Sequence, residues 1–136
     1  MIITKETDYA LRMLRVLADH ARFTASQLAQ GEQIPQQFAY KILKKLEKGG
    51  LIRTLRGAQG GCILAADLEK VSLFDLMQIM QEDSALSACM RAGYQCAWCK
   101  AHGDTVCHVN KQLSAIQQKL DAQLQAHCLQ EILFGP

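Results

Sequence analysis

The chain has 136 residues, of which 49% are hydrophobic, 21% are charged and 6% are aromatic. This composition predicts one globular domain, and the absence of both a bilayer-length apolar run and a signal peptide at the first residues predicts a cytoplasmic protein with no membrane partner. Residues 1–70 hold eleven Lys or Arg against seven Asp or Glu, whereas residues 71–136 hold four against six, so the basic N-terminal half indicates an anionic partner.

The first half of the chain predicts three helices. Residues 7–19 carry an apolar stripe opposite a charged face. The segment Thr-Ala-Ser-Gln at 24–27 is a capping box that begins a short helix ending near Gly31. A further helix is predicted over residues 35–49, between a proline suited to a first turn and a glycine suited to a last one. Helix, tight turn and helix form a helix-turn-helix.

A short hairpin is predicted after the third helix. Residues 51–55 and 62–65 read as two strands on either side of a glycine-rich tip. Such a hairpin is the wing of a winged helix. Residues 34–61 hold six cationic side chains and one anionic side chain, Glu47. This charge suits the phosphate backbone of DNA, although a solvated lysine face is the alternative interpretation.

The third helix and the wing carry the expected contacts with double-stranded DNA. Near the start of the helix, amide side chains can pair with adenine, and cations further along can bind phosphates. In the wing, an arginine can enter the minor groove where glycines allow a close backbone approach. The expected contacts are Gln36, Gln37, Tyr40, Lys41, Lys44, Arg56, Gly57 and Gly60, and Lys45 and Lys48 are further outward positions of the helix.

The second half of the chain changes character twice. Ser72 and Asp75 resemble a capping box that begins a helix reaching residue 81. Periodicity then disappears over residues 84–107 and returns from Val109 to Ile132 as one long apolar stripe. That helix is too long and too apolar on one side for a lone element, so we expect it to pack on a second copy of the chain.

The predicted fold class is therefore mainly α with a small β-hairpin wing. It consists of a winged helix-turn-helix domain over residues 1–83, a cysteine-rich loop over residues 84–108 and a dimerisation helix over residues 109–136.

The cysteine-rich loop is the candidate metal centre. Cys89, Cys96, Cys99 and Cys107 follow the pattern C-x6-C-x2-C-x7-C, and such a dense group favours a metal or cluster site over four unrelated thiols. Four-thiolate zinc is possible, but a zinc ribbon has two C-x2-C knuckles and this loop has one. Iron–sulfur ligation tolerates irregular spacing better.

Two histidines near the loop and two cysteines outside it have different expected roles. His102 and His108 could complete three-cysteine ligation, although each is more often a solvated loop histidine. Cys62 and Cys128 fall on apolar stripes, and we expect both to be core thiols.

Several motifs together resemble the Rrf2 family of bacterial winged helix-turn-helix transcription regulators. The resemblance covers essentially the whole chain. Its carriers are Thr7-Asp8-Tyr9-Ala10-Leu11-Arg12, Ile34-Pro35-x-x-Phe38, Leu46-x-x-Gly49-Gly50-Leu51-Ile52, Arg56-Gly57-x-x-Gly60-Gly61 and Val71-Ser72-Leu73-x-Asp75.

This resemblance implies an iron–sulfur cluster, with 4Fe-4S preferred and 2Fe-2S possible. It implies three cysteine ligands, for which Cys89, Cys96 and Cys107 are the equivalents. Some family members use a histidine three residues after the third cysteine, where this chain has Asn110. Others use an aspartate of the first helix, so the fourth ligand is either Cys99 or Asp8 of the partner subunit. We favour Cys99, because an all-thiolate site is the simpler ligand set.

The expected function is that of a homodimeric DNA-binding transcription regulator, most simply a repressor. A cluster sensing nitric oxide, redox state or iron would gate its operator affinity. One alternative is a winged-helix regulator with structural zinc or a Cys96–Cys99 disulfide switch, and another is an electron-transfer protein that keeps a helix-turn-helix. The sequence holds no constellation typical of an enzyme.

Overall fold

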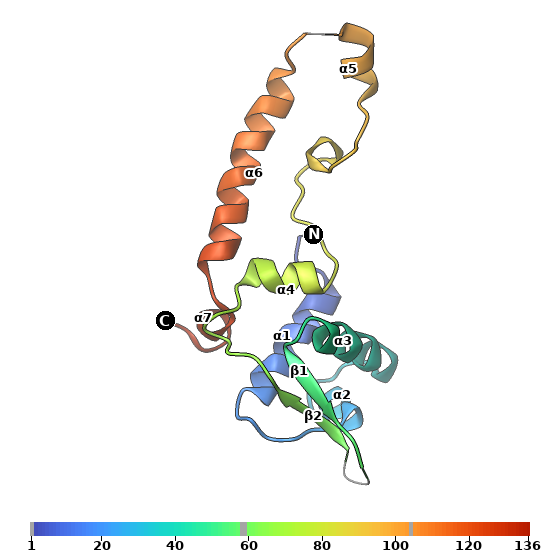
Figure 1. Cartoon of the computed structure of the whole chain (residues 1–136), viewed down its shortest axis with the longest axis vertical. Coiled ribbons are helices and arrows are strands. Elements are labelled where there is room, and N and C mark those ends of the chain that lie inside the picture. The colour runs from blue at the N-terminus through green and yellow to red at the C-terminus, as the bar shows by residue number, and fades with distance from the viewer. Residues whose placement is uncertain (1, 58–59, 104) are drawn as a thin grey trace.

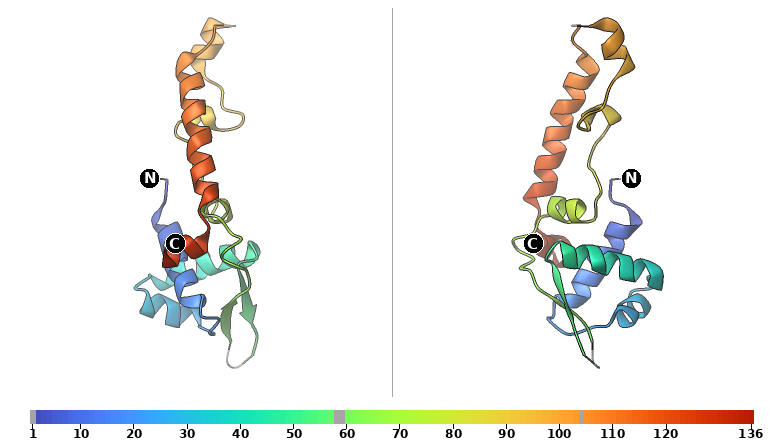
Figure 2. Two further views of the ribbon diagram at one scale, coloured as in Figure 1. Left: turned by 90° about the vertical axis from the view of Figure 1, so that its left-hand side faces the viewer. Right: turned by 45° about the vertical axis from the view of Figure 1, so that its right-hand side comes forward.

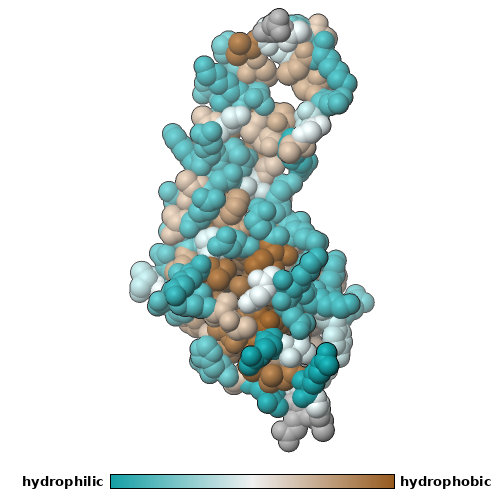
Figure 3. Space-filling view, in the orientation of Figure 1, coloured by the Kyte–Doolittle hydropathy of each residue, from teal (hydrophilic) through white to brown (hydrophobic). Residues whose placement is uncertain are grey.

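The computed structural model describes residues 2–57, 60–103 and 105–136. It consists of a globular part and a long arm that projects from it (Figures 1 and 2). The arm has two segments, one leading away from the globular part and one returning to it, and they run side by side. We use the word arm for residues 82–126. In the surface view the arm stands clear of the globular part, and hydrophobic surface gathers mainly on the latter (Figure 3).

Three helices form the base of the globular part. They are α1 (Lys5–Leu17), α2 (Ala25–Gly31) and α3 (Gln36–Lys48), and α3 packs on both α1 and α2. Thr24 caps α2 in the predicted capping box, since its hydroxyl accepts from the Gln27 amide and the Gln27 side chain accepts from the Thr24 amide. The helix-turn-helix expected from the sequence is therefore present.

The wing is a two-stranded antiparallel sheet of β1 (Ile52–Leu55) and β2 (Gly61–Leu64), in which Ile52 pairs with Leu64 and Leu55 with Gly61. Phe23 extends it by a bridge to Cys62. Gly61 has a φ of 137°, and a Cβ there would come within 2.8 Å of the Phe23 carbonyl oxygen. Only glycine fits this approach without strain.

The arm leaves the globular part after α4 (Leu73–Ile79), which begins at the predicted capping box of Ser72 and Asp75. It ascends through η1 (Ala88–Met90) and α5 (Ala97–His102), two short helices within a stretch expected to lack structure. It returns along α6 (His108–Ala126), which packs on η1 and α4. No helix in the described ranges is long and apolar enough to cross a membrane.

The expectation of one continuous helix from Val109 to Ile132 was wrong. The chain leaves α6 at His127 and starts a second helix, α7 (Leu129–Phe134), after Cys128. Two backbone hydrogen bonds fix the break, from the Leu73 amide to the His127 carbonyl and from the Leu129 amide to the Val71 carbonyl. Leu129 is thereby fully buried in the winged-helix core, and burial of that side chain outweighs continuation of the helix.

The core draws on every helix of the globular part. Its largest fully buried apolar side chains are Met13, Leu14, Leu17, Leu28, Ile42, Leu46, Leu76, Met77, Met80 and Leu129. The apolar stripes of the sequence account for most of these, but Met13, Leu28 and Leu129 lie outside them. By contrast, α6 buries none of its residues in the single chain.

Candidate nucleic-acid interface and metal centre

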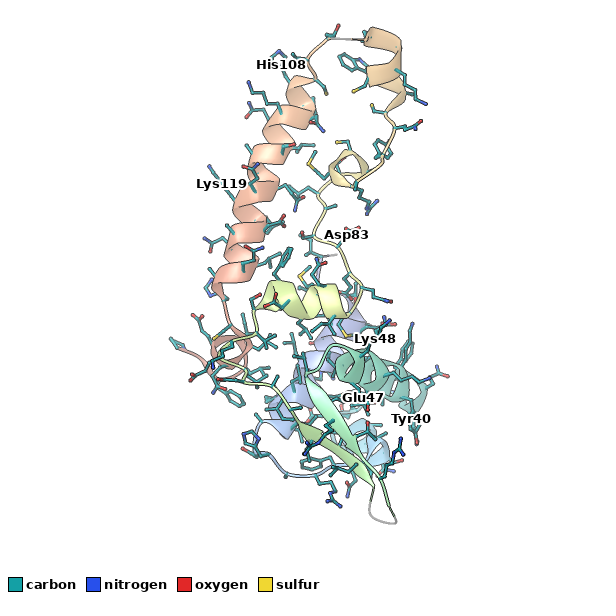
Figure 4. The ribbon with its side chains drawn as sticks, viewed as in Figure 1. Tyr40, Glu47, Lys48, Asp83, His108 and Lys119 are labelled. Carbon is teal, nitrogen blue, oxygen red and sulfur yellow. The ribbon has the colours of Figure 1, made fainter. Side chains whose placement is uncertain are left out.

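Helix α3 presents a polar face to solvent at its start. Gln36, Gln37, Tyr40 and Lys44 are all exposed, as predicted. Tyr40 lies on the side of α3 turned away from α4 (Figure 4) and is 55% exposed. Side chains at the start of α3 are therefore accessible to a ligand.

The lysines of α3 divide into two kinds. Lys44 and Lys48 are exposed. Lys45, expected to point outward, instead turns inward, where its ammonium lies 3.1 Å from Glu6 Oε2 and donates to the Met80 carbonyl. Lys41 remains more than half exposed while contacting Glu6 Oε1 at 2.9 Å. Lys45 therefore links α3 to α1 and α4, because Glu6 and the Met80 carbonyl lie next to the face of α3 that carries Lys45.

The wing places its arginines at the surface. Arg53 and Arg56 are exposed, and Gly57 adopts a φ of 114° with open space around its Cα. Gly60 has a structural role as well, since its amide closes a turn onto the Gly57 carbonyl. Residues 58 and 59 of the predicted tip lie outside the described residues.

A hollow of about 710 Å³ lies inside the arm, and all four loop cysteines line it. We call it the cysteine hollow. Cys89 comes from η1, Cys96 and Cys99 from the start of α5, and Cys107 from the N-cap of α6. Three separate elements, two of them short, thus place cysteines around one space. The predicted cysteine set is brought together by the fold.

Local hydrogen bonds activate two of these thiols. Hydrogen bonds from the Ser87 hydroxyl and the Asn110 side chain lower the pKa of Cys89. The backbone amides of Cys99 and Trp98 lower the pKa of Cys96, which occupies the N-cap position of α5. Desolvation and the adjacent Cys96 sulfur raise the pKa of Cys99. Thiolates, which bind metals, are accordingly favoured at Cys89 and Cys96.

The donor set fits a polynuclear group better than a lone ion. Among the described residues, no three or more His, Cys, Asp or Glu side chains are gathered so as to hold a single metal ion. Tetrahedral zinc needs four donors at about 2.0–2.3 Å from one point. An iron–sulfur cluster takes its thiolates on separate irons, which suits sulfurs spread around a hollow.

The other candidate ligands do not line the cysteine hollow. Asp8 pairs with Arg12 at 2.8 Å on α1. His102 stacks on Trp98, with its Nδ1 2.8 Å from the Trp98 carbonyl, and His108 is exposed at the far end of α6 (Figure 4). Cys62 is a buried thiol in β2 of the wing, as expected, whereas Cys128 is only partly buried and occupies the N-cap position of α7.

A polar clasp, made of Ser84, Leu86, Gln117 and Asp121, fastens the start of the arm to α6. Gln117 Nε2 donates to the Ser84 carbonyl at 2.8 Å and to Asp121 Oδ1 at 2.9 Å, and its Oε1 accepts from the Leu86 amide at 2.7 Å. Ser84 also donates to Asp121 at 2.5 Å. The clasp was not anticipated from the sequence, because its two halves, residues 84–86 and residues 117–121, lie more than 30 residues apart.

Glu82 joins the same segment to the winged helix. Its carboxylate accepts from Thr7 Oγ1 at 2.5 Å and from the Thr4 hydroxyl. Thr7 is fully buried, so the contact is shielded from solvent. The start of the cysteine-bearing segment is therefore anchored both to α1, through Glu82, and to α6, through the clasp.

A family model described as Rrf2, iron-dependent transcriptional regulator, matches residues 3–134. Protein aau3 of Rhizobium meliloti is 33% identical over 68% of this chain and 62% of its own length. A putative HTH-type transcriptional regulator, rrf2-like, of Rhodobacter capsulatus is 32% identical over 81% of this chain and 77% of its own length. The transcriptional regulator NsrR of Oceanobacillus iheyensis is 31% identical over 68% of this chain and 65% of its own length.

Solved structures share the fold. The structure of T. potens IscR superposes with a TM-score of 0.65 at 18% identity, over 98% of this chain and 86% of the other. CymR, the global cysteine regulator of B. subtilis, superposes with a TM-score of 0.73 at 15% identity, over 98% and 96% of the two chains. Both likenesses confirm the winged-helix fold with a C-terminal helix.

Proposed function

Because this chain belongs to the Rrf2 family of transcriptional regulators, we propose that it is a repressor whose operator affinity is gated by an iron–sulfur cluster held in the cysteine hollow. Family membership makes it a DNA-binding winged-helix regulator and points away from an enzyme. The observation that carries the finer proposal is that four cysteines from three separate elements line one hollow.

The proposed ligands are Cys89, Cys96, Cys99 and Cys107. The lowered pKa values of Cys89 and Cys96 favour the thiolate forms that a cluster requires. Cys99 lines the same hollow as the other three, whereas Asp8 pairs with Arg12 within its own chain. We therefore prefer Cys99 as the fourth ligand over Asp8 of the partner subunit.

A bound cluster would supply the chemistry of sensing, because iron–sulfur clusters react with nitric oxide and oxidants and are lost when iron is scarce. The role of the chain is to hold the two segments of the arm together. Thiolates from η1, α5 and the α6 N-cap can bind one cluster only while these segments stay side by side. Release of the thiolates removes that constraint, and Glu82 and the clasp pass the change to α1 and α6.

The proposed DNA surface consists of α3 and the wing. Gln36, Gln37 and Tyr40 would read bases, and Lys41 and Lys44 would contact phosphates. Arg56 would enter the minor groove, where Gly57 and Gly60 allow the wing to come close. Two such surfaces, about 34 Å apart, would meet successive turns of the duplex.

The second surface would come from a homodimer. Helix α6 exposes Val109 and Ile116 and buries none of its residues in the single chain. We propose that this face packs on the same face of a second copy. Within the predicted division of the chain, residues 109–126 would then serve dimerisation, while α7 packs on the winged helix.

The test is an absorption spectrum of protein purified without oxygen, with iron, acid-labile sulfide and zinc analyses. We expect visible charge-transfer bands and about four iron and four sulfide per protomer for 4Fe-4S, or about two of each for 2Fe-2S. Cys107→Ala should fold and lose the chromophore, whereas Cys128→Ser should keep it. Unchanged iron content in Cys107→Ala would contradict the ligand assignment.

A thiol switch is the second candidate, because Cys96 and Cys99 lie one turn apart at the start of α5 with a low and a raised pKa. A peroxide would oxidise the Cys96 thiolate to a sulfenic acid, and attack of the Cys99 sulfur on that sulfur would close a disulfide with release of water. Colourless protein whose operator affinity changes reversibly with a dithiol reductant would support this candidate. A colourless protein with about one tightly bound zinc would indicate a structural zinc site.

A further inference from the structure

A small polar cluster, Ser26, Gln36 and Tyr40, occupies the surface between α2 and α3. Ser26 comes from the first turn of α2, Gln36 is the first residue of α3 and Tyr40 lies one turn later. Ser26 and Tyr40 also line a hollow of about 290 Å³ that reaches Lys44 and Thr54 of the wing. The cluster therefore sits where the helix and the wing meet on the proposed DNA surface.

The hydrogen bonds of Gln36 use up its donors. A glutamine amide has two N–H donors and one carbonyl oxygen. Gln36 Nε2 donates to Ser26 Oγ at 2.9 Å and to Tyr40 Oη at 3.5 Å. With both hydrogens turned back onto the protein, the group that remains for an outside partner is the acceptor Oε1.

The same contact leaves Tyr40 with a hydrogen-bond donor for an outside partner. Its hydroxyl oxygen accepts from Gln36, so its own proton is available to donate. Its side chain is 55% exposed on the outer side of α3 (Figure 4). Gln36 and Tyr40 thus offer one acceptor and one donor next to each other.

Only one base shows the matching pattern on its major-groove edge. Adenine presents the N6 amino donor beside the N7 acceptor, whereas guanine presents two acceptors, thymine an acceptor and a methyl group, and cytosine an amino donor. We propose that Ser26, Gln36 and Tyr40 form a composite adenine reader, with Gln36 Oε1 accepting from N6 and the Tyr40 hydroxyl donating to N7. Ser26 is a positioning residue that keeps the amide in the accepting orientation.

This proposal rests on the DNA-binding function and adds the base that the site selects. It differs from ordinary recognition by a lone glutamine, which would use its own N–H group for N7. The two modes make different demands on Ser26 and Tyr40. In the composite reader, removal of the tyrosine hydroxyl removes the contact to N7.

The experiment begins with selection of an operator from randomised duplex DNA by the full-length wild-type protein. We expect an adenine in each half-site whose preference disappears in Gln36→Ala. That adenine is then replaced by 7-deazaadenine, which lacks the N7 acceptor, or by purine, which lacks the amino group. Each replacement should weaken wild-type binding about tenfold.

Variants assign each contact. In Tyr40→Phe, 7-deazaadenine should cause no further loss, while purine should still weaken binding. Ser26→Ala should bind the operator but discriminate less against guanine, because the freed amide can turn its N–H toward O6. Gln30→Ala, at the other end of α2, is the matched control and should keep the wild-type preferences. Thermal unfolding of each variant checks that the fold is intact.

Three results would contradict the proposed recognition of adenine by Ser26, Gln36 and Tyr40. They are an operator without the expected adenine, an equal loss from 7-deazaadenine in wild type and Tyr40→Phe, and unchanged discrimination in Ser26→Ala. Failure of the proposed function is distinguishable, because a wild-type protein that selects no duplex sequence would contradict that function first.

Discussion

Glu6 illustrates how single side chains divide the basic face of α3. Its carboxylate accepts from both Lys41 and Lys45, and these contacts, the Lys41 hydrogen bond first, lower the pKa of Glu6. Because the folded pKa is lower than the unfolded one, the pairing stabilises the protein above the unfolded pKa. This stabilisation is lost as the pH falls through the folded pKa.

We predict that Glu6→Gln lowers the free energy of unfolding by about 0.5–1 kcal/mol at pH 7, since the three side chains are partly solvated. The difference between variant and wild type should shrink as the pH falls below about 4. Urea denaturation at several pH values measures it. Asp67→Asn, which removes the exposed contact with Lys70, is the control and should have little effect at any pH.

A second residue-scale prediction separates the two candidates for the fourth ligand. Cys99→Ser should shift the visible spectrum and shorten the lifetime of the cluster in air, because a hydroxyl replaces a thiolate in the cysteine hollow. Asp8→Asn should leave the spectrum unchanged and cost only a few tenths of a kcal/mol through its lost pair with Arg12. Spectra of the two variants purified side by side decide between them, and the opposite pattern would assign the ligand to Asp8 of the partner subunit.

Among the elements, the boundary between α6 and α7 departs most from the expectation. The apolar stripe from Val109 to Ile132 satisfies helical spacing throughout, so periodicity contained no sign of a break. The break arises from backbone contacts with Leu73 and Val71 and from burial of Leu129. By contrast, the capping boxes at Thr24 and Ser72 were readable, since each depends on residues three positions apart.

We predict that Leu129→Ala destabilises the cluster-free protein by about 2–5 kcal/mol, because it leaves a cavity among fully buried side chains. The urea midpoint should fall with little change in slope. Ile132→Ala in the same helix is the matched control, since Ile132 is 41% exposed. Equal losses in the two variants would contradict the docking of α7 into the core.

At the scale of the whole molecule, the arm joins the proposed metal centre to the winged helix. Glu82 contacts α1, and the clasp ties residues 84 and 86 to α6. In the proposed mechanism, these contacts connect the state of the cysteines to the placement of the DNA surface. The response of such a regulator would depend on how firmly the clasp holds the two segments of the arm together.

We predict that Gln117→Leu weakens this connection, because it removes hydrogen bonds to Ser84, Leu86 and Asp121. The ratio of operator affinities between cluster-loaded and cluster-free protein should fall about fivefold or more toward unity. Fluorescence anisotropy with operator DNA measures the ratio, and faster amide exchange over residues 84–91 should accompany the loss. Gln112→Leu, on an exposed position of α6, should preserve the wild-type ratio.

The sequence by itself determined the winged helix, the wing, the dense cysteine set and the family, because each depends on short-range periodicity, caps or spacing. Tertiary structure alone decided that Lys45 faces Glu6 and Met80, that the helix breaks between α6 and α7 and that Gln36 donates to Ser26. It also decided that Gln117 clasps the arm. These outcomes depend on which distant groups meet in the folded chain, and spacing along one element contains no information about its partners.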